Sequence, residues 1–172
     1  MELGEPKIEE EKKEPKIHSV QFDNSHFGEI YSPIDTLGLV AEMNDWWQNI
    51  SVENGYPNKD DKRWKNVDYY MMELGKDALE WGDGEREIKI ILEGDRITVV
   101  VSDQGNGFEN PNDDIESHPN HGLFVVKKFA DEFIIETNGK KFTKVPKKRK
   151  LAMTEETDVK KGTRITFVKN LK

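Results

Sequence analysis

Two alternating apolar runs on either side of a turn dipeptide constrain the fold of this chain more than any other feature. The runs EIKIILE and RITVVVS, residues 87–93 and 96–102, flank Gly94-Asp95. β-branched residues at alternate positions favour a half-buried strand, and a Gly-containing dipeptide between two such runs is typical of a β-hairpin. The second run leads into the segment 103–107, Asp-Gln-Gly-Asn-Gly. The sequence therefore predicts a sheet with an acid and two spaced glycines at the end of one strand.

Further periodic segments surround this hairpin. Some alternate as strands do, and others place apolar residues on one face of a helix. The expected strands are 17–23, 133–138 and 162–169, and the expected helices are 34–50, 65–81 and 121–133. Whether residues 151–161 form a further strand is left open by their sequence. Because strands and helices alternate in blocks, the expected fold class is α+β: a single-domain α/β sandwich whose mixed, mostly antiparallel sheet has helices on one face.

Composition sets the expected extent of the folded domain. The chain has 172 residues, a length that fits one domain, but only 34% are hydrophobic and 35% are charged. The first 16 residues combine acids, lysines and two prolines with almost no apolar side chains. We expect residues 1–16 to form a flexible charged tail, with a partner-binding arm as the alternative, and residues 17–172 to form the domain.

Charge and residue usage limit the classes of partner. A net charge of −8 argues against a nucleic-acid binder, and the basic run 140–150 is expected to be a solvated loop, with contact to an acidic partner or a phosphate as the alternative. The chain has no cysteine, which excludes disulfides and fits a reducing compartment. No apolar run reaches the length of about 20 residues that a membrane span needs. A cytoplasmic protein that binds neither nucleic acid nor membrane is the resulting expectation.

A pair of carboxylates lies on the expected helix 65–81. Glu73 and Asp77 are four residues apart, so that both project from one face of the helix. Such a pair can hold a hard cation such as Mg²⁺, or one member can act as a general base beside it. The alternative is an ordinary exposed acidic pair on a helix surface.

The strand end at Asp103 suggests a second set of contacts. A carboxylate there can accept a hydrogen bond from an exocyclic amine such as that of adenine, and Gly105 and Gly107 allow the backbone to approach a planar ligand. Further along, Gly122 opens the expected helix 121–133 and leaves free N–H groups that suit a phosphate. The alternatives are a tight turn at the first glycines and a simple helix N-cap at Gly122.

The order of these motifs resembles that of the GHKL ATP-binding domains, the Bergerat or histidine-kinase-like ATPase fold. ELGKDALEWG at 73–82 is similar to the N box, DQGNGF at 103–108 to the first glycine box, HGLFVVKKFADEF at 121–133 to the second, and GTRITF at 162–167 to the closing strand. The resemblance covers about residues 17–170. The single-domain format is most similar to the anti-sigma-factor serine kinases.

This resemblance implies a role for each residue of the motifs. Asp103 would accept from the adenine amino group with the help of Thr163, and the two glycines of the first box would let the backbone approach the base. Gly122 and Leu123 would offer amides to the phosphates of ATP. The remaining implied roles are Glu73 as the catalytic base and Asp77 as the Mg²⁺ ligand.

The implied function is an ATP-binding regulatory protein that phosphorylates or sequesters a protein partner, either an antagonist or a sigma-factor-like regulator; a homodimer is also left open. Three departures favour an alternative, a non-catalytic or degenerate GHKL interaction module. Asp77 replaces the usual asparagine, Trp81 replaces a common histidine, and the expected lid 109–121 is acidic without any lysine or arginine.

Overall fold

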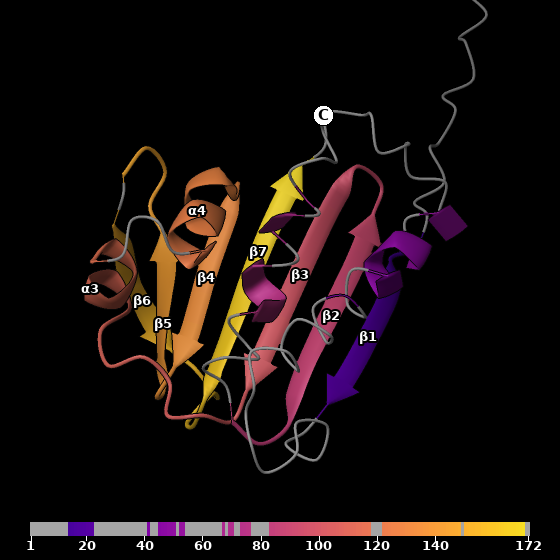
Figure 1. The fold of residues 1–172 in the computed structure, drawn as a ribbon. Helices are drawn as coiled ribbons and strands as arrows, with labels where there is room; N and C mark the ends of the chain where they lie inside the picture. Colours follow the sequence, from indigo (N-terminus) through magenta and orange to yellow (C-terminus); the bar gives the residue numbers. More distant parts are fainter. Residues whose placement is uncertain are drawn as a thin grey trace, which may run out of the picture.

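The computed structural model describes residues 14–22, 41, 45–50, 52–53, 67, 69–70, 73–76, 83–117, 122–148 and 150–170. Seven strands form one sheet, in the order β1-β2-β3-β7-β4-β5-β6 (Figure 1). The strands are β1 (Lys16–Phe22), β2 (Arg86–Glu93), β3 (Arg96–Asp103), β4 (Glu132–Thr137), β5 (Lys140–Lys144), β6 (Leu151–Glu156) and β7 (Thr163–Asn170). Every pairing between neighbouring strands is antiparallel.

The expected fold class, an α+β sandwich with a mixed sheet and helices on one face, is wrong. Of the residues described, 44% are in strands and 28% in helices, and the helices are few and short, so that the fold is a β-rich antiparallel one. Helical segments between strands had suggested parallel neighbours. Instead β7 lies between β3 and β4 and runs antiparallel to both. β3 and β4, which a helical segment separates in the sequence, are therefore not hydrogen-bonded to each other.

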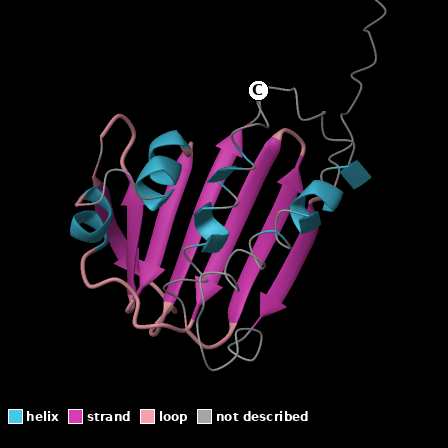
Figure 2. Cartoon of the chain, in the orientation of Figure 1, coloured by secondary structure: helices cyan, strands magenta, loops and turns pink. Residues whose placement is uncertain are grey.

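The sheet has one strongly buried face. Alternate residues of the central strands are buried, as in β2 at Ile88 and Ile90, and their neighbours are only half-buried. The same core cluster includes three buried residues in helical segments, Trp47, Val67 and Leu74. This alternation with a period of two is the burial pattern of a sheet covered on one face. The secondary structure of this arrangement is drawn in Figure 2.

The hairpin predicted at Gly94-Asp95 is confirmed, as β2 and β3 pair from Glu93 and Arg96 outwards. The expected strands near 17–23, 133–138 and 162–169 correspond to β1, β4 and β7. The basic run is only partly a loop, because its first five residues form β5, and residues 151–156 form β6. β6 is the edge strand of the sheet, so β5 is paired on both sides, with β4 and with β6.

Two helices have defined bounds, α3 (Pro111–Glu116) and α4 (Gly122–Phe129). In Figure 1 both lie over the part of the sheet formed by β4, β5 and β6. α4 corresponds to the helix expected at 121–133, and those residues within 34–50 and 65–81 that are described are helical. α3 lies in the segment expected to be a lid loop. Its N-cap Asn110 accepts from the Asn112 N–H, and Pro111 opens its first turn.

Most of the expected tail, residues 1–13, lies outside the described residues. Within the part of the chain that is described, no helix is long and apolar enough to cross a membrane.

Candidate functional site

The end of β3 brings Asp103 beside Thr163, the first residue of β7. The two are directly paired across the strands. Oδ1 of Asp103 accepts the Gly105 N–H at 2.7 Å, and no described residue donates to Oδ2. Thr163 is buried, and none of the described residues forms a hydrogen bond with its hydroxyl. The strand ends thus leave an acceptor and a hydroxyl side by side.

Asp103 and Thr163 both line an open hollow with a volume of about 420 Å³. Partial burial raises the pKa of the Asp103 carboxyl above its ordinary value; the Gly105 N–H and the positive charge of Arg86 oppose this rise. A partly desolvated carboxylate gains more from a hydrogen-bond donor than one in water does. Most of the remaining lining is polar or charged: Ser102, Gln104, Asp158, Lys160, Lys161 and Arg164.

The segment after Asp103 fits closely against the ends of two other strands. Gly107 has φ +71°, and a Cβ there would overlap the Thr137 hydroxyl and come within 2.9 Å of the Gly162 carbonyl oxygen. Gly162 has φ +78°, and its Cβ would overlap the carbonyl oxygen of Asp103 and lie 2.8 Å from Cα of Gln104. Gly105 is buried. Both the backbone conformation and the lack of space therefore require glycine at 107 and 162.

Thr137 and Asn138, at the end of β4, are site residues that the sequence did not single out. The Thr137 hydroxyl accepts the Phe108 N–H at 2.9 Å and donates to the Gly162 carbonyl at 3.1 Å. The Asn138 side-chain amide donates to the carbonyl oxygens of Asn106 and Phe108. The dipeptide Asn138-Gly139 between two strands is a strong hairpin signal, which would have located the turn but not these contacts.

Glu73 and Gly122, predicted to act on one ligand, are brought together. A Cβ on Gly122 would overlap Oε2 of Glu73 and lie 2.8 Å from its Cβ, so this carboxylate occupies the space at the beginning of α4. Leu123, the next residue, is 8% exposed and belongs to the core. Its side chain is therefore structural, and only its backbone amide could serve a ligand. Asp77, the expected Mg²⁺ ligand, and Trp81 lie outside the described residues.

The described part of the expected lid, residues 109–117, contains α3 with Asp113 and Asp114 in its first turn. Glu116 of this segment forms an ion pair with Lys127 of α4, which is 3% exposed. This pair connects the end of α3 to α4. It also gives the buried ammonium group of Lys127 a carboxylate partner.

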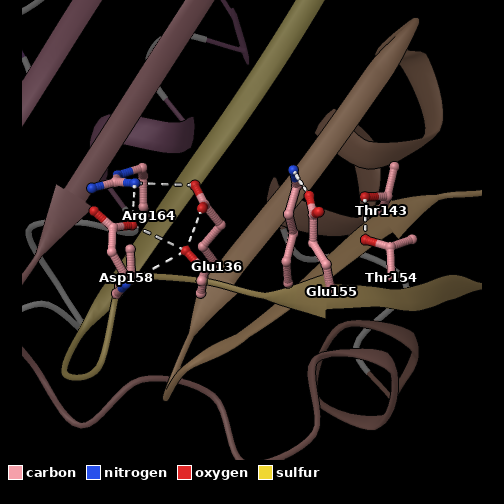
Figure 3. Close-up of polar contacts among 9 residues, drawn as sticks. Glu136, Thr143, Thr154, Glu155, Asp158 and Arg164 are labelled. Atoms are coloured by element: carbon pink, nitrogen blue, oxygen red, sulfur yellow. Dashed lines mark hydrogen bonds and ion pairs between the residues drawn. The ribbon is translucent and has the colours of Figure 1, made fainter.

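A polar network borders the hollow on the β7 side (Figure 3). Arg164 Nη1 lies 3.4 Å from Oε2 of Glu136 and 3.3 Å from Oδ1 of Asp158, and Thr157 donates to Oε1 of Glu136 at 2.6 Å. The same view shows the Lys141–Glu155 ion pair and the contact between Thr143 and Thr154. Acids balance Arg164, so this border is not a strongly basic surface.

No group of three or more potential metal ligands (His, Cys, Asp or Glu) occurs among the residues that the structure describes. Comparison of the whole sequence with family models and with curated proteins gives no match.

Proposed function

We propose that this chain is an ATP-binding regulatory protein and that the hollow beside Asp103 receives the adenine base. The observation that carries this proposal is the pair formed by Asp103 and Thr163, in which a partly desolvated carboxylate keeps one oxygen without a donor from the described residues. Adenine offers an exocyclic amine to such an oxygen and a ring nitrogen to a hydroxyl. The volume of about 420 Å³ falls in the usual range of small-molecule sites, roughly 300–1,000 Å³.

The position of Glu73 supports an enzyme of the anti-sigma-factor serine/threonine kinase type. Its carboxylate lies against Gly122, at the helix N-terminus where we expect the phosphates. A base within reach of the phosphate site can orient the attacking hydroxyl of a protein partner. Asp77 would supply an oxygen ligand to Mg²⁺, which neutralises phosphate charge when bound. We expect the phosphorylated partner to be an antagonist or a sigma-factor-like regulator in the cytoplasm.

A second function, a binding module without phosphoryl transfer, is favoured by the ion pair between Lys127 and Glu116. Phosphoryl transfer needs positive charge near the transferred group. All charged side chains among the described lid residues are acidic, and the ammonium group of Lys127 forms an ion pair with Glu116. In this alternative the nucleotide acts as a conformational ligand, and the protein sequesters its partner without modifying it.

Isothermal titration calorimetry with Mg²⁺ and either ATP or GTP tests the adenine site. We expect ATP to bind more tightly than GTP, because GTP places a carbonyl oxygen where ATP has its amine. Asp103→Asn should weaken ATP binding by about 1–3 kcal/mol, the usual effect of disturbing a buried hydrogen-bonded group. Glu155→Gln is the matched control, since it also exchanges a carboxylate for an amide, at a residue that does not line the hollow and whose side chain is 59% exposed. Absence of ATP binding to the wild type would overturn the proposal.

Glu73→Gln separates the two candidate functions. With the protein partner present, this variant should keep most of its ATP affinity but transfer phosphate about 10²–10⁴ times more slowly, the range typical of general base catalysis. Tight ATP binding with no transfer by the wild type would instead support the binding module.

A further inference from the structure

The β4–β5 turn holds the segment that follows Asp103. Thr137, the last residue of β4, is 1% exposed, and its hydroxyl joins the Phe108 N–H to the Gly162 carbonyl. Phe108 lies five positions after Asp103, and Gly162 immediately precedes Thr163. The Thr137 hydroxyl therefore connects the segment that carries Asp103 to the segment that carries Thr163.

Asn138 holds the same segment through its side chain. It adopts φ +50°, a left-handed conformation that asparagine tolerates better than most residues. Its Nδ2 donates to the carbonyl oxygens of Asn106 at 3.2 Å and of Phe108 at 3.1 Å. Three hydrogen bonds from two adjacent residues thus fix the backbone of 106–108.

The turn is itself fixed to the segment that precedes β7. The Gly139 N–H donates to the Val159 carbonyl at 2.7 Å, and the Thr157 N–H donates to the Gly139 carbonyl at 3.1 Å. The 106–108 backbone, the 137–139 turn and residues 157–162 are consequently connected to one another. A Cβ on Gly107 would overlap the Thr137 hydroxyl, so the backbone at 107 lies close against the end of β4.

We propose that Thr137 and Asn138 are positioning residues of the nucleotide site: they hold residues 103–108 against β7 so that Asp103 and Thr163 face the hollow before a ligand arrives. This inference rests on the proposed function. Neither residue lines the hollow, so both act through the backbone that they hold. Fixing a binding segment in advance increases affinity by reducing the ordering cost of binding.

Thr137→Val and Thr137→Ser provide a matched test, because valine keeps the shape of threonine without its hydroxyl and serine keeps the hydroxyl. We expect valine to accelerate amide hydrogen exchange at Phe108 and to weaken ATP binding by about 5- to 100-fold, and serine to restore both. Thr143→Val is the control: it removes a threonine contact with Thr154 at 3.3 Å in the neighbouring strands and should change neither quantity.

The double variant Thr137→Val, Asp103→Asn distinguishes positioning from general stability. If Thr137 acts through Asp103, the two losses of ATP affinity will combine to less than their product. Independent losses, or a loss of stability with unchanged ATP affinity, would overturn the positioning role. Should Thr137→Val not fold, Asn138→Asp keeps the size of the side chain, lacks the amide donor and should accelerate exchange at Phe108.

Failure of the proposed function can be distinguished from failure of the positioning role. If the wild type binds no ATP, the adenine site is refuted, and amide exchange alone decides the holding role. Faster exchange at Phe108 in Thr137→Val, reversed in Thr137→Ser, would then support that role. Unchanged exchange would overturn it.

Discussion

Asp103 illustrates, at the level of a single residue, a conflict between stability and binding. Burial raises the pKa of its carboxyl above the ordinary value of 3.8, so the folded state binds more protons than the unfolded state between 3.8 and the raised value. Stability therefore falls as the pH rises through this window, and the full cost remains at pH 7. A ligand that donates to the carboxylate would offset that cost. Functional sites commonly retain such local destabilisation.

Asp103→Asn should consequently be more stable than the wild type at pH 7, although we expect it to bind ATP less tightly. The difference in the free energy of unfolding should shrink as the pH falls through the window toward 3.8, because both side chains are then neutral. Urea unfolding of both proteins at a series of pH values measures it. A variant that is less stable than the wild type at pH 7 would contradict this account.

The site residues that the sequence singled out are those with a local signal. Asp103, Gly107 and Thr163 each stand at a strand end or in a glycine-rich turn, where short patterns are informative. Thr137 had no such signal. Its hydrogen bonds reach residues 29 and 25 positions away, and a threonine at the end of a strand has nothing to mark a contact at that separation. Contacts between residues so far apart in the sequence can be predicted only once the order of the strands in the sheet is known.

At the level of elements, the turn before β7 depends on Gly162 for two separate reasons. Its φ of +78° disfavours any residue with a Cβ, and the added atom would overlap the Asp103 carbonyl oxygen. Gly94, in the β2–β3 turn, shares only the first of these, because it has φ +57° and nothing within 4 Å of the added atom. A substitution at Gly94 therefore measures the cost of backbone strain alone, whereas one at Gly162 measures that cost together with the cost of a steric overlap.

We expect Gly94→Ala to lower the free energy of unfolding by about 1–2 kcal/mol, the cost of a left-handed conformation. Gly162→Ala should lower it by about 2–5 kcal/mol, because overpacking adds a further contribution. Chemical denaturation with equal m-values for both variants would make the comparison valid. Equal losses would indicate that the backbone around Asp103 moves aside at little cost.

Helices and strands could be predicted from the sequence wherever the local residue patterns agreed on one structure. The β2–β3 hairpin combines strict alternation with a turn dipeptide, and both point to the same structure. β5 was missed because its lysines resemble a solvated loop, whereas Lys144 donates to the carbonyl oxygens of Lys128 and Ala130. α3 was missed although Asn110-Pro111 is a recognised helix start, because the resemblance had suggested a lid there.

At the level of the whole molecule, the position of β7 could not be read from the sequence. Local patterns predict strands and hairpins, but no local pattern indicates that the last strand inserts between β3 and β4. It pairs antiparallel with both, and this pairing places Thr163 between Asp103 and Thr137. The same insertion that overturned the expected mixed sheet therefore assembles the candidate site.

From this topology we expect the last strand to be essential for the fold and the first one to be dispensable. β7 pairs with two strands and contributes Ile165 and Phe167 to the core, at 6% and 0% exposure. β1 pairs only with β2, and Ile17 on it is 59% exposed. Removal of an edge strand costs one ladder of hydrogen bonds, whereas removal of a central strand splits the sheet and its core.

Deletion of residues 163–172 should therefore abolish cooperative unfolding, while a chain that begins at residue 23 should still unfold cooperatively at a lower denaturant concentration. Circular dichroism during urea titration distinguishes the two outcomes through the sharpness of the transition. The variant without residues 163–172 should also lose ATP binding, since Thr163 is gone and Asp103 loses its pairing with β7. Cooperative folding after the C-terminal deletion would mean that β3 and β4 can pair directly, which would contradict the central role assigned to β7.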